Sequence, residues 1–351
     1  MRGALPQSCA ASRNPESSQA VSELHKFIFD GLPVRGAIVR LDGAWQEMLA
    51  RRNANTEHGA YPAPVRALLG EMAAAGVLMQ SNIKFNGALV LQIFGDGPVR
   101  LAVAEVQSDL TLRATAAITG PVAQDAKLTA MVNVAGGGRC AITLDPKDKF
   151  PGQQPYQGVV PLVDAADRPL EQLSDVLAHY MRQSEQLDAV LVLAANDQVA
   201  AGLLIQRMPV QGEANLAGGG PAGSGPASQE DLDEEYHRIA TLASSLTAQE
   251  LLSLDVDTVL RRLFWEETVV RFAAQEGAGG PRFACSCSRQ RVSRMLETLG
   301  REEADSILAE QGQIEVGCEY CGQQYRFDAI DVAQIFAAPL VLQPPAPGGV
   351  Q

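Results

Sequence analysis

The chain has 351 residues, of which 46% are hydrophobic and 20% are charged, and its formal net charge at pH 7 is −13. This length favours about two domains, and the composition supplies enough apolar side chains for a core. The negative charge repels phosphate backbones, which argues against a nucleic-acid partner. Residues 1–22 lack the apolar segment of a secretory signal, and no apolar run of about 18 residues could span a membrane. We therefore expect a cytoplasmic protein without membrane contact.

Changes of composition along the chain predict its domain organisation. Residues 1–22 are rich in Ala, Ser, Gln and Pro and are expected to be a disordered leader, and residues 339–351 a disordered tail. Residues 212–228 consist almost entirely of Gly, Ala, Ser and Pro, which is typical of a flexible connector. The remaining segments are an N-terminal core domain at 23–211, an amphipathic helical linker at 229–280 and a small cysteine-bearing domain at 281–338.

Apolar alternation predicts a core domain with many strands. Order is expected to begin at residues 24–29, followed by a strand at 36–41 and by a hairpin of strands at 89–94 and 99–105. Further strands are expected at 110–118, 140–144, 156–162, 189–195 and 199–207, and helices with apolar faces at 45–52, 64–85 and 169–185. Strands and helices do not alternate regularly, so the predicted fold class is α+β, with a mixed sheet and helix core.

The linker is predicted to form amphipathic helices. The expected helix starts are Ser228, Thr247 with Glu250 as a capping box, and Asp257. An apolar stripe runs from Leu232 to Leu246, and the third helix carries Phe264 and Trp265. Such stripes must be covered, and the sequence leaves two interpretations open. The helices pack permanently on the core domain, or they form a cover that is held only while the cysteine domain is folded.

Four of the six cysteines occur as two close pairs, Cys285 with Cys287 and Cys318 with Cys321. Two such pairs predict one four-thiolate metal site, and zinc is the expected ion because it takes four sulfurs tetrahedrally without a redox change. Each pair could also close into a disulfide if the metal left, since a disulfide needs Cα atoms roughly 4.4 to 6.8 Å apart. Spacing alone therefore leaves open a purely structural site and a thiol switch.

The surroundings of the cysteines predict a small helical module with a hairpin. Expected helices lie at residues 288–299, 302–310 and 329–336, and strands at 314–316 and 324–327. The first of these helices is expected to turn four side chains inward: Val292, Met295, Leu296 and Leu299. Positive charge is expected around the first cysteine pair from Arg282, Arg289, Arg291 and Arg294. Cys9 and Cys140 have no partner at ligand spacing, and we interpret both as bystanders.

Other candidate sites are set aside on physical grounds. The glycines at 136–138 are followed neither by Lys-Ser/Thr nor by a helix, so a turn between strands is predicted instead of a phosphate loop. His25 has no second histidine at ligand spacing and is interpreted as a surface or packing residue. A four-thiolate shell leaves no open position for metal-assisted hydrolysis. With no catalytic constellation in the sequence, we expect a protein that is not an enzyme.

Several motifs resemble one known family. Phe283, the two cysteine pairs, residues 299–305 and residues 325–328 look like the redox-switch domain of the 33 kDa chaperonin family, the redox-regulated heat-shock holdases of bacteria. In the core domain the segments that resemble the same family, in the same order, are 35–41, 95–100, 137–145, 156–158 and 180–186.

This resemblance implies a redox-regulated chaperone that holds unfolding proteins without ATP. It implies that the reduced, zinc-bound form is inactive, and that oxidation forms the disulfides Cys285–Cys287 and Cys318–Cys321, releases zinc and exposes hydrophobic surface. It further implies a homodimer when oxidised and hand-over of clients to ATP-driven refolding chaperones. From the residues alone, two alternatives are a constitutive binding or assembly protein with a structural zinc site, and a thiol-disulfide oxidoreductase that uses Cys318 and Cys321. The oxidoreductase lacks a thioredoxin-like βαβ context.

Overall fold

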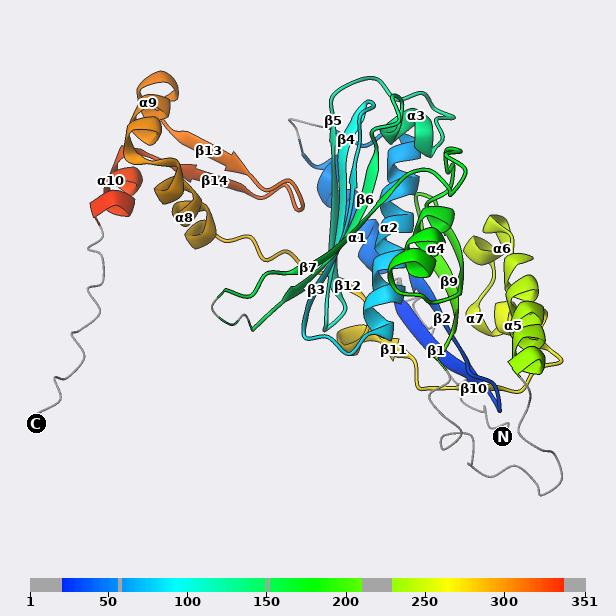
Figure 1. The fold of residues 1–351 in the computed structure, drawn as a ribbon. Helices are drawn as coiled ribbons and strands as arrows, with labels where there is room; N and C mark the ends of the chain where they lie inside the picture. Colours follow the sequence, from blue (N-terminus) through cyan, green and yellow to red (C-terminus); the bar gives the residue numbers. More distant parts are fainter. Residues whose placement is uncertain (1–20, 56–58, 149, 151, 210–228, 338–351) are drawn as a thin grey trace, which may run out of the picture.

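The computed structural model describes residues 21–55, 59–148, 150, 152–209 and 229–337. In these residues an α+β arrangement contains two six-stranded sheets and, near the C-terminus, a separate two-stranded sheet (Figure 1). The predicted connector and tail lie outside the described residues, as does Cys9, and only the last two residues of the predicted leader fall within them. The α+β fold class is confirmed.

The first sheet has the strand order β10-β1-β2-β9-β8, with β11 also beside β1. Its strands are β1 (Glu23–Phe29), β2 (Val34–Leu41), β8 (Ala189–Ala195), β9 (Ala200–Arg207), β10 (Val269–Arg271) and β11 (Gln275–Glu276). Neighbouring strands pair antiparallel. The predicted strands are confirmed, whereas β10 and β11 were missed because segments of two or three residues are too short to show alternation.

The second sheet has the strand order β12-β5-β4-β3-β6-β7. Its strands are β3 (Gly87–Phe94), β4 (Val99–Gln107), β5 (Thr111–Ile118), β6 (Arg139–Pro146), β7 (Tyr156–Pro161) and β12 (Arg282–Phe283). The short β12 pairs in parallel with β5 and ends just before Cys285. This pairing brings the first cysteine pair to the edge of the core, a placement that the sequence did not predict.

Helix α2 (Ala63–Asn82) packs against both sheets and is buried along most of its length, as the sequence predicted (Figure 1). Small residues let the backbones approach closely. A Cβ added to Gly70 would lie 2.4 Å from Ala195 Cβ, and one added to Gly76 would lie 2.8 Å from Val106 Cγ2. The other helices of the core are α1 (Gly43–Asn53), α3 (Leu128–Val132) and α4 (Leu173–Ser184), of which the five-residue α3 was not predicted.

The linker helices cover the face of the first sheet that points away from α2. They are α5 (Gln229–Ser244), α6 (Ala248–Ser253) and α7 (Val256–Phe264). Alternation along β9 divides the two faces, because Leu204 joins the cluster around α2 while Leu203 and Ile205 join the cluster under the linker helices. We call this second cluster the linker core.

In the linker the predicted capping box of Thr247 and Glu250 is confirmed, whereas the start of α7 and the position of Trp265 differ from the prediction. Helix α7, however, begins after Asp255 and not at Asp257, because the Asp255 carboxylate accepts a hydrogen bond from the Thr258 N–H. Trp265 follows the end of α7 and is 73% exposed, so it does not belong to the apolar face.

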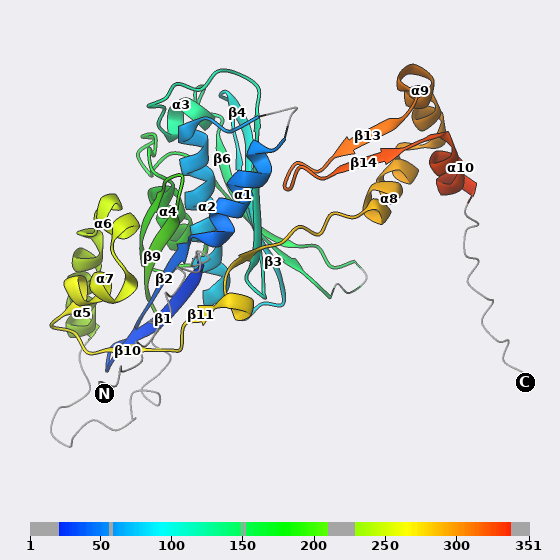
Figure 2. The same cartoon turned by 180° about the vertical axis from the view of Figure 1, so that it is seen from behind.

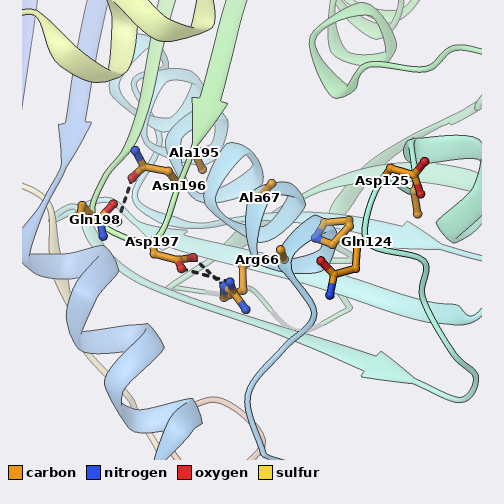
Figure 3. Close-up of a pocket in the computed structure, with 11 residues that line it drawn as sticks. Arg66, Ala67, Gln124, Asp125, Ala195, Asn196, Asp197 and Gln198 are labelled. Atoms are coloured by element: carbon orange, nitrogen blue, oxygen red, sulfur yellow. Dashed lines mark hydrogen bonds and ion pairs between the residues drawn. The ribbon is translucent and has the colours of Figure 1, made fainter.

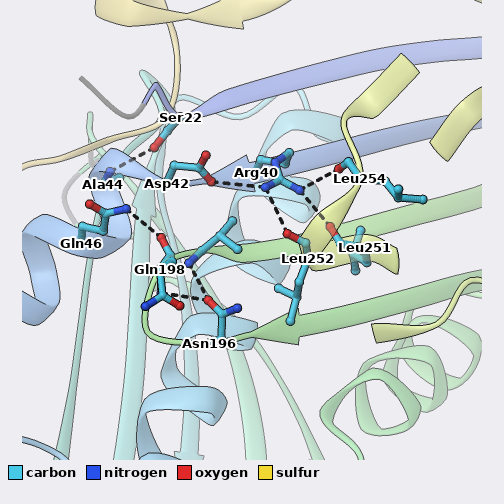
Figure 4. Close-up of polar contacts among 11 residues, drawn as sticks. Ser22, Arg40, Asp42, Ala44, Gln46, Asn196, Gln198, Leu251, Leu252 and Leu254 are labelled. Atoms are coloured by element: carbon cyan, nitrogen blue, oxygen red, sulfur yellow. Dashed lines mark hydrogen bonds and ion pairs between the residues drawn. The ribbon is translucent and has the colours of Figure 1, made fainter. Parts of the chain in front are cut away.

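A guanidinium from the first sheet holds the end of α6 (Figure 4). Arg40 Nη1 donates to the carbonyl oxygens of Leu251 at 3.0 Å and Leu254 at 2.9 Å, and Arg40 Nη2 donates to that of Leu252 at 3.3 Å. Carbonyls at a helix end lack partners within the helix, so this charged donor satisfies groups that would otherwise need water. Nearby, Gln46 Nε2 donates to the Gln198 carbonyl at 3.0 Å and ties α1 to the β8–β9 turn (Figure 4).

Residues 285–337 form what we call the four-cysteine module. It contains α8 (Arg289–Leu299), α9 (Arg301–Gln311), β13 (Ile314–Gly317), β14 (Gln324–Phe327) and α10 (Ala329–Ala337), as predicted. Its fully buried apolar residues are Leu296, Ala304, Ile314, Phe327 and Val332. Leu296 is fully buried and Val292 packs against this small core, as predicted, whereas Met295 and Leu299 were expected to face inward but are each 49% exposed. Figure 2 shows the module standing away from the sheets, with the β13–β14 turn directed at the core.

No helix within the described residues is both long enough and apolar enough to cross a membrane.

Candidate metal centre

The structure brings the four predicted cysteines together. The sulfurs of Cys285, Cys287, Cys318 and Cys321 all lie within 4.8 Å of one another. The Cys285 and Cys318 sulfurs are 3.6 Å apart, and those of Cys287 and Cys321 are 3.3 Å apart. The first pair follows β12, and the second lies in the turn between β13 and β14. The cluster is therefore built from two loops that are distant in sequence.

Local backbone structure fixes each loop. In the β13–β14 turn, the Cys318 N–H donates to the Gln323 carbonyl at 2.9 Å and the Gly322 N–H donates to the Cys318 carbonyl at 2.8 Å. Gly322 has φ of +70°, a conformation that favours glycine. On the other loop, Ser288 caps α8 by accepting a hydrogen bond from the Arg291 N–H. Both loops thus have their own turn or cap.

The sulfurs of the cluster favour the presence of a cation. Burial opposes ionisation of Cys285, but hydrogen bonds from the Cys287 N–H and from neighbouring thiols outweigh it and lower the pKa of Cys285 to about 7. Burial raises the pKa of Cys318 and of Cys321. Four negative charges this close repel one another, so the full thiolate set requires a compensating positive charge.

The donor set fits a tetrahedral thiophilic metal ion. With metal–sulfur bonds of about 2.3 Å, tetrahedral geometry places sulfurs about 3.8 Å apart. The two sulfur–sulfur separations of 3.6 and 3.3 Å and the limit of 4.8 Å for the whole cluster bracket this value. Four sulfurs would fill the coordination shell, which is typical of a structural site and not of a catalytic one. The cluster is a candidate metal centre without an open position for substrate.

Hydrogen-bond donors from two regions surround the cluster. Tyr325 Oη donates to Cys287 Sγ at 3.1 Å, and this bond raises the pKa of Tyr325 to about 12. From β5, Arg113 Nη1 lies 3.9 Å from Cys285 Sγ and donates to Ser286 Oγ at 3.1 Å. Tyr325 belongs to the motif at residues 325–328, but its contact with a cysteine was not predicted, and Arg113 was not predicted as part of the site.

The predicted arginine environment of the first pair is only partly present. Arg291 Nη1 donates to Ser286 Oγ at 2.6 Å, next to Cys285. Arg282 instead pairs with Asp109 at 2.8 Å, and Arg289 pairs with Asp331 at 2.7 Å. A cation that the sequence did not predict, the Arg113 guanidinium, lies 3.9 Å from Cys285 Sγ. Arg113 and Thr115 are two residues apart and so lie on the same side of β5. Nothing in the sequence connects β5 with a loop so far along the chain.

The remaining predictions concern residues outside the cluster. Cys140 is fully buried in β6, where burial raises its pKa to about 12, so it is a packing residue. His25 is also buried and contacts Glu23 at 2.9 Å and Arg271 at 3.0 Å. The predicted glycine turn is confirmed, because the Gly137 N–H donates to Asp96 at 2.6 Å just before β6.

An open pocket of 530 Å³ lies away from the cysteines, beside the start of α2 and the β8–β9 turn (Figure 3). Arg66 pairs with Asp197 at its edge, with 2.7 Å between Nε and Oδ1. Asp125 and Gln124 line another side, and the labelled polar groups do not converge on a common point (Figure 3). The four-cysteine cluster is therefore the stronger candidate site.

Fold and site together define a two-part protein, an α+β core of two sheets followed by a small four-cysteine module. A family model described as Hsp33 protein matches residues 22–328. The 33 kDa chaperonin of Chromobacterium violaceum is 45% identical over 316 residues, covering 90% of this chain and 93% of that protein. That of Neisseria meningitidis serogroup A is 41% identical over 319 residues, covering 90% and 92%. The chain belongs to the Hsp33 family.

A solved structure supports the same fold. The crystal structure of the 33 kDa chaperonin from Thermotoga maritima matches with a TM-score of 0.65 and 21% identity, covering 89% of this chain and 97% of that one. The family resemblance inferred from short motifs is thus confirmed.

Proposed function

We propose that the protein is a redox-regulated, ATP-independent molecular chaperone that acts in the cytoplasm during stress. It holds unfolding proteins and prevents their aggregation, and it is not an enzyme. The observation that carries the proposal is the gathering of four sulfurs within 4.8 Å on a module with a small core. The family supports it, because the curated relatives are named 33 kDa chaperonin.

In the reduced protein, Cys285, Cys287, Cys318 and Cys321 hold one zinc ion. The ion supplies charge compensation and cross-links the two loops. Oxidation removes two electrons and any thiol protons from each cysteine pair and forms the disulfides Cys285–Cys287 and Cys318–Cys321, while hydrogen peroxide is reduced to water. Disulfide sulfurs are poor ligands compared with thiolates, so the module loses its metal.

Loss of the metal is expected to unfold the module. A unit of about 55 residues buries too little surface to be robust alone. A structural zinc ion contributes on the order of 10 to 16 kcal/mol at neutral pH, as much as the roughly 5 to 15 kcal/mol that stabilises a whole domain. Unfolding of the module would weaken the contacts that keep β12 and the preceding linker in place on the core. Release of α5–α7 would then uncover the apolar linker core, including Phe29 and Leu203, for unfolding clients.

The proposal extends to partners. Clients are unfolding proteins that expose apolar side chains, and the oxidised form is a homodimer that hands them to ATP-driven refolding chaperones. The domain boundaries at residues 211, 228, 280 and 338 remain part of the same proposal.

A second candidate is a constitutive binding or assembly protein whose metal is only structural. The observation that favours it is the close packing of the linker, since Ile239, Leu263 and Phe264 are at most 2% exposed. A thiol-disulfide oxidoreductase is less well supported, because burial raises the pKa of both Cys318 and Cys321 and so opposes the reactive thiolate.

One experiment separates these functions. Zinc release is followed with a chromogenic chelator during peroxide treatment at raised temperature, and suppression of a model client's aggregation is measured on the same samples. The redox chaperone predicts that release and holding activity rise together and that reductant reverses both. If holding activity is independent of the oxidant, the metal is structural, and turnover of a disulfide substrate would instead support the oxidoreductase.

A further inference from the structure

The turn that carries the second cysteine pair also contacts the core. Glu319 and Tyr320, between Cys318 and Cys321, line a small cavity with side chains from α1, α2, β5 and the segment before α2. The apolar and aromatic members of this lining are Trp45, Met48, Leu49, Tyr61, Leu69 and Ala114. Only 10 Å³ of space remains between the loop and these side chains, room for at most one water. Arg52 completes the lining, with its guanidinium carbon 4.0 Å from the centroid of the Tyr61 ring. The Tyr320 side chain thus closes a pocket whose core side is apolar and aromatic apart from this one guanidinium.

Polar groups of the core also recognise the backbone of this loop. Thr115 Oγ1 donates to the Glu319 carbonyl at 3.0 Å. Tyr61 Oη lies 3.1 Å from Thr115 Oγ1 and accepts from the Ala116 N–H at 3.0 Å. Because the Thr115 hydrogen is used on Glu319, the Tyr61 hydroxyl donates to Thr115. This chain of hydrogen bonds orients the threonine toward the carbonyl.

A guanidinium forms one wall of the same site. The Arg113 guanidinium carbon lies 4.2 Å from the centroid of the Tyr320 ring, close enough for a cation–π interaction. Glu105 fixes Arg113 from within the sheet, with 2.6 Å between Arg113 Nη2 and Glu105 Oε2. Both partners of this pair lie on core strands, so the wall persists when the loop leaves.

The site therefore recognises a backbone carbonyl followed by an aromatic ring. We propose that Tyr320 is a built-in occupant of a peptide-binding pocket on the core, and that release of its loop opens the pocket to an aromatic residue of an unfolding client. Aromatic side chains are largely buried in folded proteins and become available when proteins unfold. This inference rests on the proposed chaperone function, which supplies the release step.

The pocket is separate from the surface under the linker helices. Those helices cover the first sheet, whereas Ala114 and Thr115 lie on β5 of the second sheet. Loss of the module alone would open it, without movement of α5–α7. The protein would then offer two client-binding surfaces, one broad and apolar and one selective for aromatic residues.

Tryptophan fluorescence provides a direct test in the full-length chain. Of the two tryptophans, Trp45 is 1% exposed and lines the pocket, and Trp265 is 73% exposed. In a Trp265→Phe protein, all tryptophan fluorescence comes from Trp45. We expect acrylamide to quench it weakly in the reduced, zinc-loaded state and severalfold more strongly after peroxide and mild heat.

A peptide probe tests what the pocket binds. The probe Gly-Ser-Glu-Tyr-Ser-Gly reproduces residues 317–322 with serine in place of both cysteines. We expect it to restore the shielding of Trp45 in the oxidised protein. The same peptide with alanine in place of tyrosine should bind at least about tenfold more weakly, which corresponds to about 1.4 kcal/mol. Equal binding of the two peptides would overturn the proposal.

Variants at Tyr320 test the pocket without an oxidant. Tyr320→Ala should raise the quenching of Trp45 in the reduced protein, with zinc content checked by chelator in the same sample. Tyr320→Phe retains the ring and should shield Trp45 as the unaltered loop does. Tyr156→Ala, which removes an exposed tyrosine from β7, is the matched control and should leave quenching unchanged.

The outcomes separate this inference from the function on which it rests. If holding activity appears after zinc release while Trp45 stays shielded, the chaperone function stands and the pocket proposal is wrong. If oxidation releases no zinc and produces no holding activity, the proposed function is wrong. In that case the proposal of a client pocket falls with it, and Tyr320→Ala shows only whether the ring shields Trp45.

Discussion

The core and the four-cysteine module are stabilised in different ways. In the core, Trp45, Met72 and Leu91 are at most 1% exposed and belong to a cluster that spans both sheets and α2. In the module, the buried cluster contains only five residues, and four sulfurs lie beside it. Burial of apolar surface stabilises the first region, whereas the second, in the function proposed above, depends on a metal cross-link. In that proposal a chemical change at four atoms would unfold one region and leave the other folded.

The linker belongs physically to the core although it leads to the module. Helices α5–α7 share the linker core with β1, β2, β8 and β9, and β10, β11 and β12 extend the two sheets. The last of these strands ends at Phe283, two residues before Cys285. On loss of a bound metal the linker would either stay folded on the core or unfold with the module.

The largest effect is expected from removal of a metal ligand. Cys318→Ser should abolish stoichiometric zinc binding and unfold the module, because it removes most of a contribution on the order of 10 kcal/mol. Limited proteolysis should then cut within residues 285–337 while the core remains intact. Cys140→Ala, at a buried cysteine of β6, is the matched control and should retain zinc. Retention of zinc and protease resistance by Cys318→Ser would show that burial, not metal, holds the module.

The next largest effect is expected in the linker core. Phe264 packs edge-on against Phe29, with ring centroids 5.0 Å apart, and is 2% exposed. Phe264→Ala should destabilise the linker helices by about 3 to 5 kcal/mol through lost burial and a cavity. We expect it to bind an apolar dye and hold clients in the reduced state with zinc still bound.

The neighbouring Trp265→Ala is the control for this prediction, since Trp265 is 73% exposed and its loss should change little. If Phe264→Ala loses zinc together with its linker helices, the linker and the module unfold as one unit. That result would show that the linker helices and the four-cysteine module are not stabilised independently of each other.

Periodicity predicted most of the core because its elements are long and locally patterned. Apolar alternation continues along the whole strand predicted at residues 89–94. Apolar residues at helical spacing continue over several turns of the helix predicted at 64–85. Strands β10, β11 and β12 were missed because each has two or three residues and forms only by adding to an existing sheet edge. Their pairing is a tertiary effect that local pattern does not contain.

The candidate site shows the same division. Cysteine spacing was sufficient to select the four sulfurs, because ligand pairs on short loops leave a local signal. The surroundings were not predictable in this way. Arg113 and Thr115 meet the loop of Cys318 only through the three-dimensional placement of β5, and Arg282 is drawn to Asp109 instead of to the cysteines. Contacts between distant segments thus set the environment of a locally encoded site.

A smaller effect is expected from the polar anchor of the linker. Arg40→Met removes the donor that satisfies the carbonyls at the end of α6, and such charged hydrogen bonds contribute about 1.5 to 3 kcal/mol. Hydrogen exchange should accelerate in α6 and α7 but not in the module. Arg100→Met, at an exposed arginine of β4, is the matched control. Equal acceleration in the module would indicate that the linker and the module are coupled.

The smallest effect is a pH dependence confined to the core. Burial on α2 raises the pKa of Glu71 from 4.5 to about 7. The folded state therefore binds more protons than the unfolded state between these values, and the free energy of unfolding falls as pH rises from about 4.5 through 7. Glu71→Gln, which resembles the protonated side chain, should match the parent protein at low pH and exceed its stability at pH 8. The expected gain is about 1 to 2 kcal/mol, because the side chain still reaches solvent.

Denaturant unfolding of the Trp265→Phe protein, followed through Trp45, measures this difference in the core alone. The parent and Glu71→Gln proteins should have different slopes of stability against pH, and both should release zinc at the same oxidant concentration. Identical slopes would mean that the Glu71 carboxyl is solvated in the folded state. A change in zinc release would mean that the stability of the core affects the four-cysteine module. The two regions would then be energetically coupled, although one is stabilised by a metal and the other by burial of apolar surface.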